Sequence, residues 1–374
     1  MDPWVAERAS EIARRAEREL EALVAVSSPS GDRHGAEECA SVCIALLPDA
    51  AEVERLQCSS PDHAPDLLAR LQGTGTRRIL LLGHLDTVIA HTDHRPLTRV
   101  EDRLVGSGAI DMKGGVVLAI GALRALAGRT QDYAEAALLL VCDEEWRTSP
   151  FTHVERFAGF DACLCFEGGT RHPDGAEGVV VRRKAAGTIR VTAHGRAAHS
   201  GSAPDRGHNA LLAVAAAAQA VAGCHDPQSA DHLTAVPTVM RSGETFNVVP
   251  DHGELMCDLR ADDSAAFDRV LEAVPAEVGG ARLETEVVRL WPGMDATQAT
   301  APLLERAATA LGEPLAGLPR GGASDASHFA SAIALTVDGL GPRGGAAHNP
   351  DEYVLAGSLA TRAAVALAVV DSAL

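Results

Sequence analysis

The sequence predicts an α/β protein that carries a second, α+β domain inserted into the first. The first domain is expected in two segments, residues 1–181 and 292–374, and the insertion at residues 182–291. Two observations predict this organisation. Near-continuous apolar runs such as residues 136–142 alternate with helical patterns, which is typical of buried strands in an α/β sheet. Residues 188–194 instead alternate apolar and polar side chains, as a half-exposed antiparallel strand does.

The composition indicates a globular protein that does not bind nucleic acid. The chain has 374 residues, of which 46% are apolar, so it can bury a large core. Its formal net charge is −18, and a strongly acidic surface repels the phosphate backbone of nucleic acids.

Features that place a protein in a membrane or an oxidising compartment are not found. No stretch approaches the roughly 18 apolar residues of a membrane span, and the polar N-terminus lacks the apolar core of a signal peptide. The eight cysteines form no Cys-x-x-Cys pair, and several lie in apolar runs. We therefore expect buried thiols in a reducing compartment and a cytoplasmic protein without a membrane partner.

Within residues 1–181 the apolar pattern predicts alternating helices and strands. Apolar side chains at helical spacing predict helices, whereas short apolar runs bounded by polar residues predict strands. We expect helices over residues 5–26, 36–47 and 116–127, and strands over residues 53–56, 67–71, 79–82, 136–142 and 162–166.

A polar motif follows the strand predicted at residues 79–82. Its sequence is Gly83-His84-Leu85-Asp86-Thr87-Val88. Side chains at i and i+2 share a face of an extended chain, so His84 and Asp86 emerge together at the carboxyl end of the strand, where open α/β sheets bind ligands. An Asp near a metal-binding His can orient the imidazole ring. The alternative is a polar turn that only ends the strand.

Further carboxylates lie at the ends of other predicted elements. Asp111 precedes a glycine pair and a helix, and its alternative role is a helix N-cap. Asp143-Glu144-Glu145 and Glu167 each follow a buried strand, with a solvated turn as the alternative for the three adjacent acids. Together with His84, such oxygen donors along one sheet edge suit a divalent metal. Two ions would need a bridging group and a second histidine.

Residues 182–291 are predicted to fold as a small domain with the order β-α-β-β-α-β. The strands are expected near residues 188–194, 236–240, 254–260 and 282–290, and the helices near residues 209–222 and 264–274.

The remainder of the chain returns to α/β character. We expect a helix over residues 301–311, a polar turn at residues 321–327, a strand over residues 333–337, a flexible loop at residues 341–345 that delivers His348, and a terminal helix over residues 351–370.

These motifs, taken together, resemble those of the co-catalytic dizinc metallopeptidase family that includes glutamate carboxypeptidase, acetylornithine deacetylase and succinyl-diaminopimelate desuccinylase. The resemblance covers nearly the whole chain. It implies a zinc-peptidase-like catalytic domain, with a mixed sheet flanked by helices, and an inserted lid and dimerisation domain. The motifs occur in family order at Gly83–Val88, Gly108–Gly115, Asp143–Glu145, Phe166-Glu167 and His348.

The resemblance implies a role for each polar residue of these motifs. His84 and Glu167 would bind one zinc ion, Glu145 and His348 the other, and Asp111 would bridge them with a cis Asp111–Met112 bond. Co²⁺ or Mn²⁺ could substitute for Zn²⁺. Asp86 would orient His84, and Glu144 would be the general base that activates a metal-bridging water. Spacing alone does not separate Glu144 from Glu145.

The inserted domain and a late turn match further family motifs. His199 in Gly195–Gly201 would donate to the developing oxyanion from the partner subunit of a homodimer. Asn247 and Arg260 would hold the substrate carbonyl and α-carboxylate, although Arg260 alone would suggest a strand-end salt bridge. Gly322 and Ser324, in Gly321–Asp325, would line the substrate cavity. The Ser327-His328 pair that follows departs from the family pattern.

The function that the resemblance implies is hydrolysis of an amide bond next to a free carboxylate, as in a carboxypeptidase acting on a short peptide. Glu167 favours this branch, because the aminopeptidase branch more often has Asp. The alternatives are an N-acyl-amino-acid deacylase, an aminopeptidase and a catalytically silent dimeric binding protein. The sequence leaves open the acyl group, the amino acid released and any substrate contact of the spare cations Arg171, Arg182, Arg183 and Lys184.

Overall fold

The computed structural model describes residues 1–374 and divides the chain into two compact units. Unit 1 comprises Met1–Arg182, Asp295–Arg320 and Ser324–Leu374, and unit 2 comprises Arg183–Met294 and Gly321–Ala323. The sequence-based boundaries differ by a few residues and left the short segment Gly321–Ala323 in the first domain. It groups with unit 2, where the carbonyl oxygen of Gly322 accepts a hydrogen bond of 2.7 Å from Arg183 Nη1.

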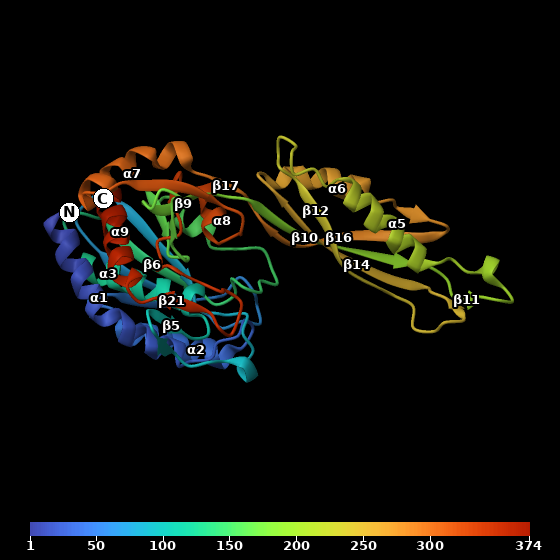
Figure 1. The fold of residues 1–374 in the computed structure, drawn as a ribbon, viewed down its shortest axis with the longest axis horizontal. Coiled ribbons are helices and arrows are strands. Elements are labelled where there is room, and N and C mark those ends of the chain that lie inside the picture. The colour runs from blue at the N-terminus through green and yellow to red at the C-terminus, as the bar shows by residue number, and fades with distance from the viewer. The chain divides into compact units, whose positions relative to one another are not determined.

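A six-stranded mixed sheet forms the centre of unit 1 (Figure 1). Four of its strands, β6, β3, β7 and β19, run parallel, and β1 and β2 pair antiparallel at one side. The side chains of β3, β6 and β7 are almost all apolar and buried, as expected for strands covered on both faces. The sheet order is β1 (Glu52–Leu56), β2 (Asp66–Gln72), β6 (Glu135–Val141), β3 (Arg78–His84), β7 (Ala162–Cys165) and β19 (Leu335–Val337).

Helices cover this sheet. Helix α3 packs on β3 and β6 and against α1 and α9, whereas the short α8 packs on β7 and β19. Helix α1 begins where Asp2 caps it by accepting the backbone N–H groups of Trp4 and Val5. The helices of unit 1 are α1 (Pro3–Val24), α2 (Arg33–Leu46), α3 (Gly114–Leu126), α4 (Val154–Phe157), α7 (Thr297–Leu311), α8 (Ala326–Ala330) and α9 (Ser358–Ala373).

Short strands complete unit 1, and they account for the main errors of the sequence analysis. The terminal helix begins at Ser358 and not at residue 351, because Tyr353–Leu355 (β21) pairs with β5 instead. The strand expected from residue 333 begins at Leu335. The additional strands are β4 (Thr98–Val100), β5 (Arg103–Val105), β8 (Thr170–Arg171), β9 (Glu177–Arg183), β17 (Met294–Asp295), β18 (Leu315–Arg320) and β20 (Gly344–Gly345).

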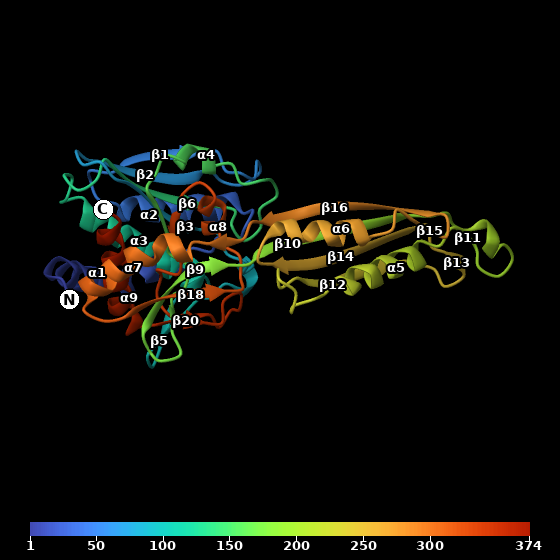
Figure 2. The ribbon, with the colours of Figure 1, turned by 90° about the horizontal axis from the view of Figure 1, so that it is seen from above.

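Unit 2 is a five-stranded antiparallel sheet with two helices on one face (Figure 2). Strand β14 alternates buried and half-buried side chains, as expected for a strand that helices cover on one face only. The elements are β10 (Ala185–His194), β11 (Ala198–His199), α5 (Ala210–Gly223), β12 (Thr234–Ser242), β13 (Val248–Val249), β14 (His252–Ala261), α6 (Asp268–Ala273), β15 (Glu277–Val278) and β16 (Ala281–Trp291).

Two general expectations can be compared with the structure. All eight cysteines are free thiols and seven are buried, as predicted. None of the helices combines the length and the apolar character that crossing a bilayer requires.

Candidate metal centre and catalytic residues

Three neighbouring parallel strands bring polar side chains to one edge of the unit 1 sheet. His84 is the last residue of β3, Asp143-Glu144-Glu145 follows β6, and Glu167 follows β7. Strand β3 pairs in parallel with both neighbours, so the carboxyl ends of the three strands meet. Asp143 and Glu145 are buried, so the solvated-turn alternative for the three adjacent acids is wrong, and His84 and Asp86 are buried as well.

The backbone around Asp111 is held by Glu352, a residue that the sequence analysis did not single out. Glu352 Oε1 accepts the backbone N–H groups of Ile110 and Asp111, at 2.7 and 2.8 Å. The N-cap position of α3 is occupied by Lys113, so the alternative of Asp111 as a helix cap is wrong. The only sequence signal for Glu352 is an acid four residues after His348.

Asp111 lies between two histidines, and its peptide bond to Met112 is cis, as the resemblance implied. Its Oδ1 is 3.1 Å from His84 Nε2, and its Oδ2 is 3.1 Å from His348 Nε2. Each imidazole has a second carboxylate nearby, because Glu167 Oε1 is 3.7 Å from His84 Nε2 and Glu145 Oε2 is 3.3 Å from His348 Nε2. The predicted ligands therefore form two His–Glu pairs that share one aspartate.

The hydrogen bonds of His84 leave its Nε2 atom, which faces the carboxylates, available to bind a metal ion. Its Nδ1 must donate, because its partner at 3.0 Å is the backbone carbonyl oxygen of Asp86. The lone pair of Nε2 then faces Asp111 and Glu167.

The electrostatics of the centre also fit a divalent metal. Hydrogen bonds with Asp111 and Glu145 raise the pKa of His348 to about 10, which shows how strongly these carboxylates favour a nearby positive charge. Ligand atoms of His84, Asp111 and Glu145 all lie within 4.8 Å of one another. Nitrogen and carboxylate donors in this arrangement suit zinc and similar transition metals.

Asp86 holds the turn that carries Glu144 and Glu145. Its Oδ1 accepts the backbone N–H of Glu144 at 3.1 Å, and its Oδ2 accepts that of Glu145 at 3.0 Å. Its Oδ1 also lies 3.4 Å from His84 Nδ1. Asp86 therefore contacts the backbone of two predicted site residues in addition to the histidine that it was predicted to orient.

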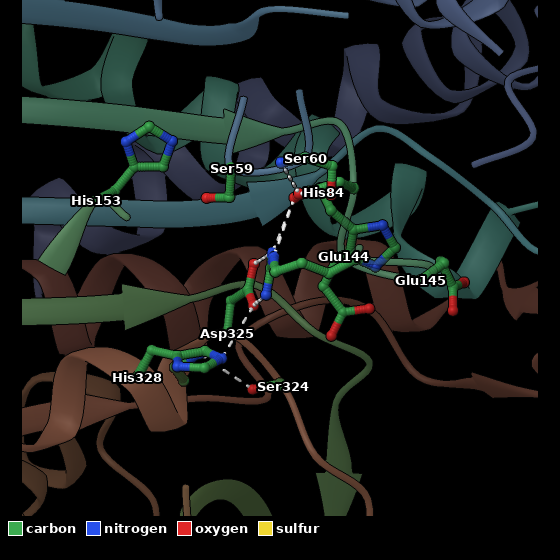
Figure 3. A network of polar contacts seen from close by, with 12 residues as sticks. Ser59, Ser60, His84, Glu144, Glu145, His153, Ser324, Asp325 and His328 are labelled. Atoms are coloured by element: carbon green, nitrogen blue, oxygen red, sulfur yellow. Dashed lines mark hydrogen bonds and ion pairs between the residues drawn. The ribbon is translucent and has the colours of Figure 1, made fainter. Parts of the chain in front are cut away.

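Glu144 lies beside this centre (Figure 3). Burial raises its pKa well above the ordinary value; His84 opposes this shift, and Asp325, Glu145 and Glu167 add to it. A carboxylate with a raised proton affinity is suited to accept a proton from water, which is the task of a general base.

A second group of possible metal ligands comprises Cys58, Asp66 and Asp143. Other side chains of the protein already compensate the negative charge of its two aspartates. Its ligand atoms also lie within 4.8 Å of one another. However, His153 Nε2 lies 2.7 Å from Asp66, and Arg147 donates twice to Asp143, at 2.9 and 3.2 Å. Burial holds the pKa of the Cys58 thiol far above its usual range, so the sulfur stays protonated. We therefore assign this group to structure and not to metal binding.

In unit 2, His199 lies at the end of β11, beside β13. Its Nδ1 accepts the backbone N–H groups of Gly201 and Ser202, both at 3.1 Å. Because an N–H group can only donate, the proton of the neutral imidazole is on Nε2, which can donate outward. The carbonyl oxygen of Asn247 accepts the N–H of Ser200 at 3.0 Å. The predicted site residues His199 and Asn247 therefore lie on adjoining segments.

Arg260 is paired with Asp258, two residues before it on β14. Its Nε and Nη2 each donate to one oxygen of Asp258, both at 3.0 Å. The salt bridge that the sequence analysis considered for Arg260 is therefore present. It uses one edge of the guanidinium group, and the edge formed by Nη1 and Nη2 can pair with a second carboxylate.

In the turn Gly321–Asp325, one of the two predicted substrate-binding residues is buried and the other is exposed. The hydroxyl of Ser324 is fully buried and donates to Asp338 at 2.6 Å, so it stabilises the turn and does not face solvent. Gly322 is exposed, and only its carbonyl oxygen is bound, by Arg183. Of the other cations that the sequence left open, Arg171 donates to Glu177 and Lys184 to the carbonyl oxygen of His232.

An α/β sheet that presents two His–Glu pairs around a shared aspartate, with a further glutamate beside them, defines a metal-dependent hydrolase. Comparison with known proteins leads to the same class. Residues 80–372 match Peptidase family M20/M25/M40, and the chain belongs to this family of metal-dependent peptidases and deacylases.

Similar proteins include two kinds of hydrolase. Carboxypeptidase G2 of Pseudomonas sp. (strain RS-16) is 25% identical over 351 residues, which cover 90% of this chain and 83% of that protein. Succinyl-diaminopimelate desuccinylase of Paracoccus denitrificans is 25% identical over 275 residues, covering 67% and 71%. Among solved structures, aminopeptidase PepT of Bacillus cereus has a TM-score of 0.78 at 21% identity, covering 96% of this chain and 98% of its own, and supports the fold.

Proposed function

We propose that this protein cleaves an amide bond next to a free carboxylate, as a carboxypeptidase of the glutamate carboxypeptidase type. The observation that supports this most is the shared aspartate, with its two oxygens each 3.1 Å from a different imidazole. We assign His84 and Glu167 to one Zn²⁺ ion, Glu145 and His348 to the other, and Asp111 to both, with Co²⁺ or Mn²⁺ as possible substitutes.

The side chains of unit 1 supply the proton transfers of this reaction. When bound, the metal ions polarise the amide carbonyl and make water more acidic. Glu144 accepts a proton from the attacking water and delivers it to the leaving amine nitrogen. Asp86 supports this step, because it binds the backbone N–H of Glu144.

Unit 2 supplies groups that bind the substrate. His199 donates its Nε2 proton to the oxygen that becomes negative when water attacks the carbonyl. Asn247 lies on the adjoining segment and binds the carbonyl group, and exposed Gly322 lines the cavity. The open edge of Arg260 donates two parallel hydrogen bonds to the free carboxylate of the substrate.

We propose that the chain is a homodimer, joined through unit 2, in which His199 acts in the partner's site. Strand β12 lies at the edge of its sheet and exposes Val236, Val239 and Met240. Leu212 of α5 is 61% exposed. An apolar edge strand is a ready surface for pairing with a second copy. Met240→Glu should produce monomers in analytical ultracentrifugation, and a wild-type monomer would contradict the proposal.

A deacylase of N-acyl amino acids is the alternative within the same chemistry, and the desuccinylase relatives favour it. The two functions differ in the group attached to the amide carbonyl. An aminopeptidase is a third possibility, but it needs a free amine on the substrate.

A hydrolysis screen tests these possibilities. The zinc-loaded protein is assayed with dipeptides, amino-blocked dipeptides, N-acyl glutamate, N-acyl ornithine and N-succinyl amino acids. We expect cleavage of at least one blocked substrate with a free carboxylate, and a decrease in kcat of about 10²–10⁴-fold for Glu144→Gln with its metal retained. Cleavage of unblocked dipeptides alone would indicate an aminopeptidase, and no cleavage at all would indicate a silent binding protein.

A further inference from the structure

A buried arginine connects the catalytic turn to a distant part of unit 1. The side chain of Arg147 is only 4% exposed. Its Nη2 and Nε donate to Asp143 Oδ1, at 2.9 and 3.2 Å. Its Nη1 and Nη2 donate to the two oxygens of Asp325, at 2.6 and 2.8 Å. One guanidinium group therefore binds two carboxylates that are far apart in the sequence.

The first carboxylate locks the turn that carries Glu144. The other oxygen of Asp143 accepts the N–H and the hydroxyl of Ser60, at 3.0 and 2.7 Å. The Ser60 hydroxyl oxygen in turn accepts the N–H of Thr148 at 2.9 Å. Residues 143–148 are thus held at both ends by one closed set of hydrogen bonds.

The second carboxylate belongs to a turn that is itself anchored to the sheet. Asp325 directly precedes α8, and Ser324 donates to Asp338, the residue after β19. The ring of Phe151 covers Arg147, whose guanidinium carbon lies 4.5 Å from the ring centroid. Arg147 therefore ties the catalytic turn to a buried part of the domain.

We propose that Arg147 is a positioning residue for Glu144, an inference that rests on the proposed function. Asp86 binds the turn on the side of the metal centre, through the N–H groups of Glu144 and Glu145. Arg147 holds the same turn through the side chain of Asp143 and ties it to Asp325. Catalytic groups need placement within about 0.5 Å, and an error of about 1 Å can cost about a hundredfold in rate.

The geometry requires an arginine at this position. Only the planar guanidinium fork can donate to both oxygens of Asp325 and also to Asp143. A lysine keeps the positive charge, so Asp143 and Asp325 stay compensated, but its ammonium group cannot reproduce four hydrogen bonds in these directions. Arg147→Lys therefore changes geometry more than charge.

A matched control exists in the same unit. Arg124 donates to both oxygens of Glu19, each at 2.7 Å, between α3 and α1, with both side chains largely buried. Arg124→Lys breaks a comparable bidentate pair away from the catalytic turn. If Arg147 only stabilises the fold, the two variants should behave alike at temperatures well below their Tm values.

The test measures kcat, KM, bound metal and Tm for wild type, Arg147→Lys, Arg124→Lys, Glu144→Gln and the double variant Arg147→Lys/Glu144→Gln. We expect Arg147→Lys to lower kcat by about tenfold or more, with KM within about twofold and metal content unchanged. Arg124→Lys should keep its kcat. In the Glu144→Gln background, Arg147→Lys should have no further effect, because it acts through Glu144.

Several outcomes would overturn the inference while leaving the proposed function intact: an unchanged kcat for folded Arg147→Lys, an equal loss in Arg124→Lys, a loss proportional to lost metal, or an additive loss in the double variant. An inactive wild type would instead contradict the proposed function. If Arg147→Lys does not fold, Asp325→Asn replaces it, because this variant keeps the Arg147–Asp143 pair and weakens the far anchor. It also removes a negative charge that acts on Glu144, so kcat is compared at the pH optimum of each protein. Its kcat must then fall with its metal content unchanged.

Discussion

Two groups of possible metal ligands meet at the turn that follows β6, and we assign only one of them to metal binding. The first contains His84, Asp111 and Glu145, and the second contains Cys58, Asp66 and Asp143. In each group the possible ligand atoms lie within 4.8 Å of one another, so proximity does not distinguish them. What differs is the set of groups that compensates the negative charge.

The compensating groups of the second set are permanent parts of the fold. Asp143 accepts hydrogen bonds from Arg147 and Ser60, and Asp66 accepts from His153 and from the backbone N–H of Cys142. In the first set Asp111 contacts two imidazoles, those of His84 and His348, and imidazoles can exchange a proton for a metal ion. The second set has one imidazole, that of His153 beside Asp66, and its Asp143 is bound by Arg147, whose guanidinium group does not give up its proton. A cluster of acids therefore indicates a metal site only when its oxygens are not already satisfied by fixed donors.

The largest expected effect separates the two groups directly. Asp111→Asn should abolish the binding of both metal ions, because its two oxygens serve both His–Glu pairs. Activity should fall by more than the 10–100-fold that is typical when a partner of a metal ligand is removed. Metal content per chain after dialysis, measured by mass spectrometry, checks this. Asp66→Asn is the control and should keep two ions; loss of metal from that variant would contradict the comparison.

A smaller loss is expected when only one pair is broken. His348→Ala should lose one metal ion and retain the other, since His84, Glu167 and Asp111 remain in place. Titration of the metal-free variant with Zn²⁺ by calorimetry should show one site with near wild-type affinity. Loss of both ions, or of neither, would show that the two pairs are not separate sites that share one aspartate.

A substitution in the second group should lower the stability of the fold and leave the metal content unchanged. Asp66→Ala leaves the N–H of Cys142 and the ring of His153 buried without their acceptor. We expect the free energy of unfolding to decrease by about 2–4 kcal/mol, from two unsatisfied donors. Urea denaturation measures this, and Cys58→Ala should cost less, because it removes no hydrogen-bond acceptor from either donor. A stable Asp66→Ala variant that had lost metal would reverse the assignment of the two groups.

The positions of the first group in the fold could be predicted from the sequence, and the contacts of the second group could not, for a physical reason. His84, Asp111, Glu145 and Glu167 each follow a strand or precede a helix with a strong apolar pattern, so their places along a sheet edge can be inferred. Arg147 acts on Asp325, 178 residues away, and no local pattern marks such a contact. The same holds for Glu352, whose target lies 241 residues before it.

The errors in the fold have a similar cause. Tyr353–Leu355 was predicted as the beginning of a helix but forms a strand, because Arg103–Val105 is available to pair with it. Short edge strands such as β4 and β20 have too few residues to show an apolar period. In unit 2, by contrast, β10 and β14 are ten residues long and alternate regularly, so their prediction needed no knowledge of distant partners.

The smallest predicted effect concerns His328, which departs from the family pattern and lies beside the second group. Its ring stacks on Phe151 at 4.9 Å and faces Asp325, Arg147 and Asp143. Burial lowers its pKa to about 4 from 6.5, with Arg147 acting in the same direction and Asp325 against it. The folded state therefore binds fewer protons than the unfolded chain between these pH values. This histidine's contribution to stability is complete above pH 6.5 and is lost as the pH falls toward about 4.

His328→Phe keeps a ring against Phe151 and removes this titration. Because one pKa unit corresponds to about 1.4 kcal/mol, the variant should lose roughly 2–3 kcal/mol less stability than wild type between pH 7 and pH 4. Urea denaturation at a series of pH values measures the difference, and the two proteins should differ less in slope above pH 7. Parallel curves over the whole range would show that His328 is accessible to protons in the folded state, and that the packing around Arg147 is looser than the structure indicates.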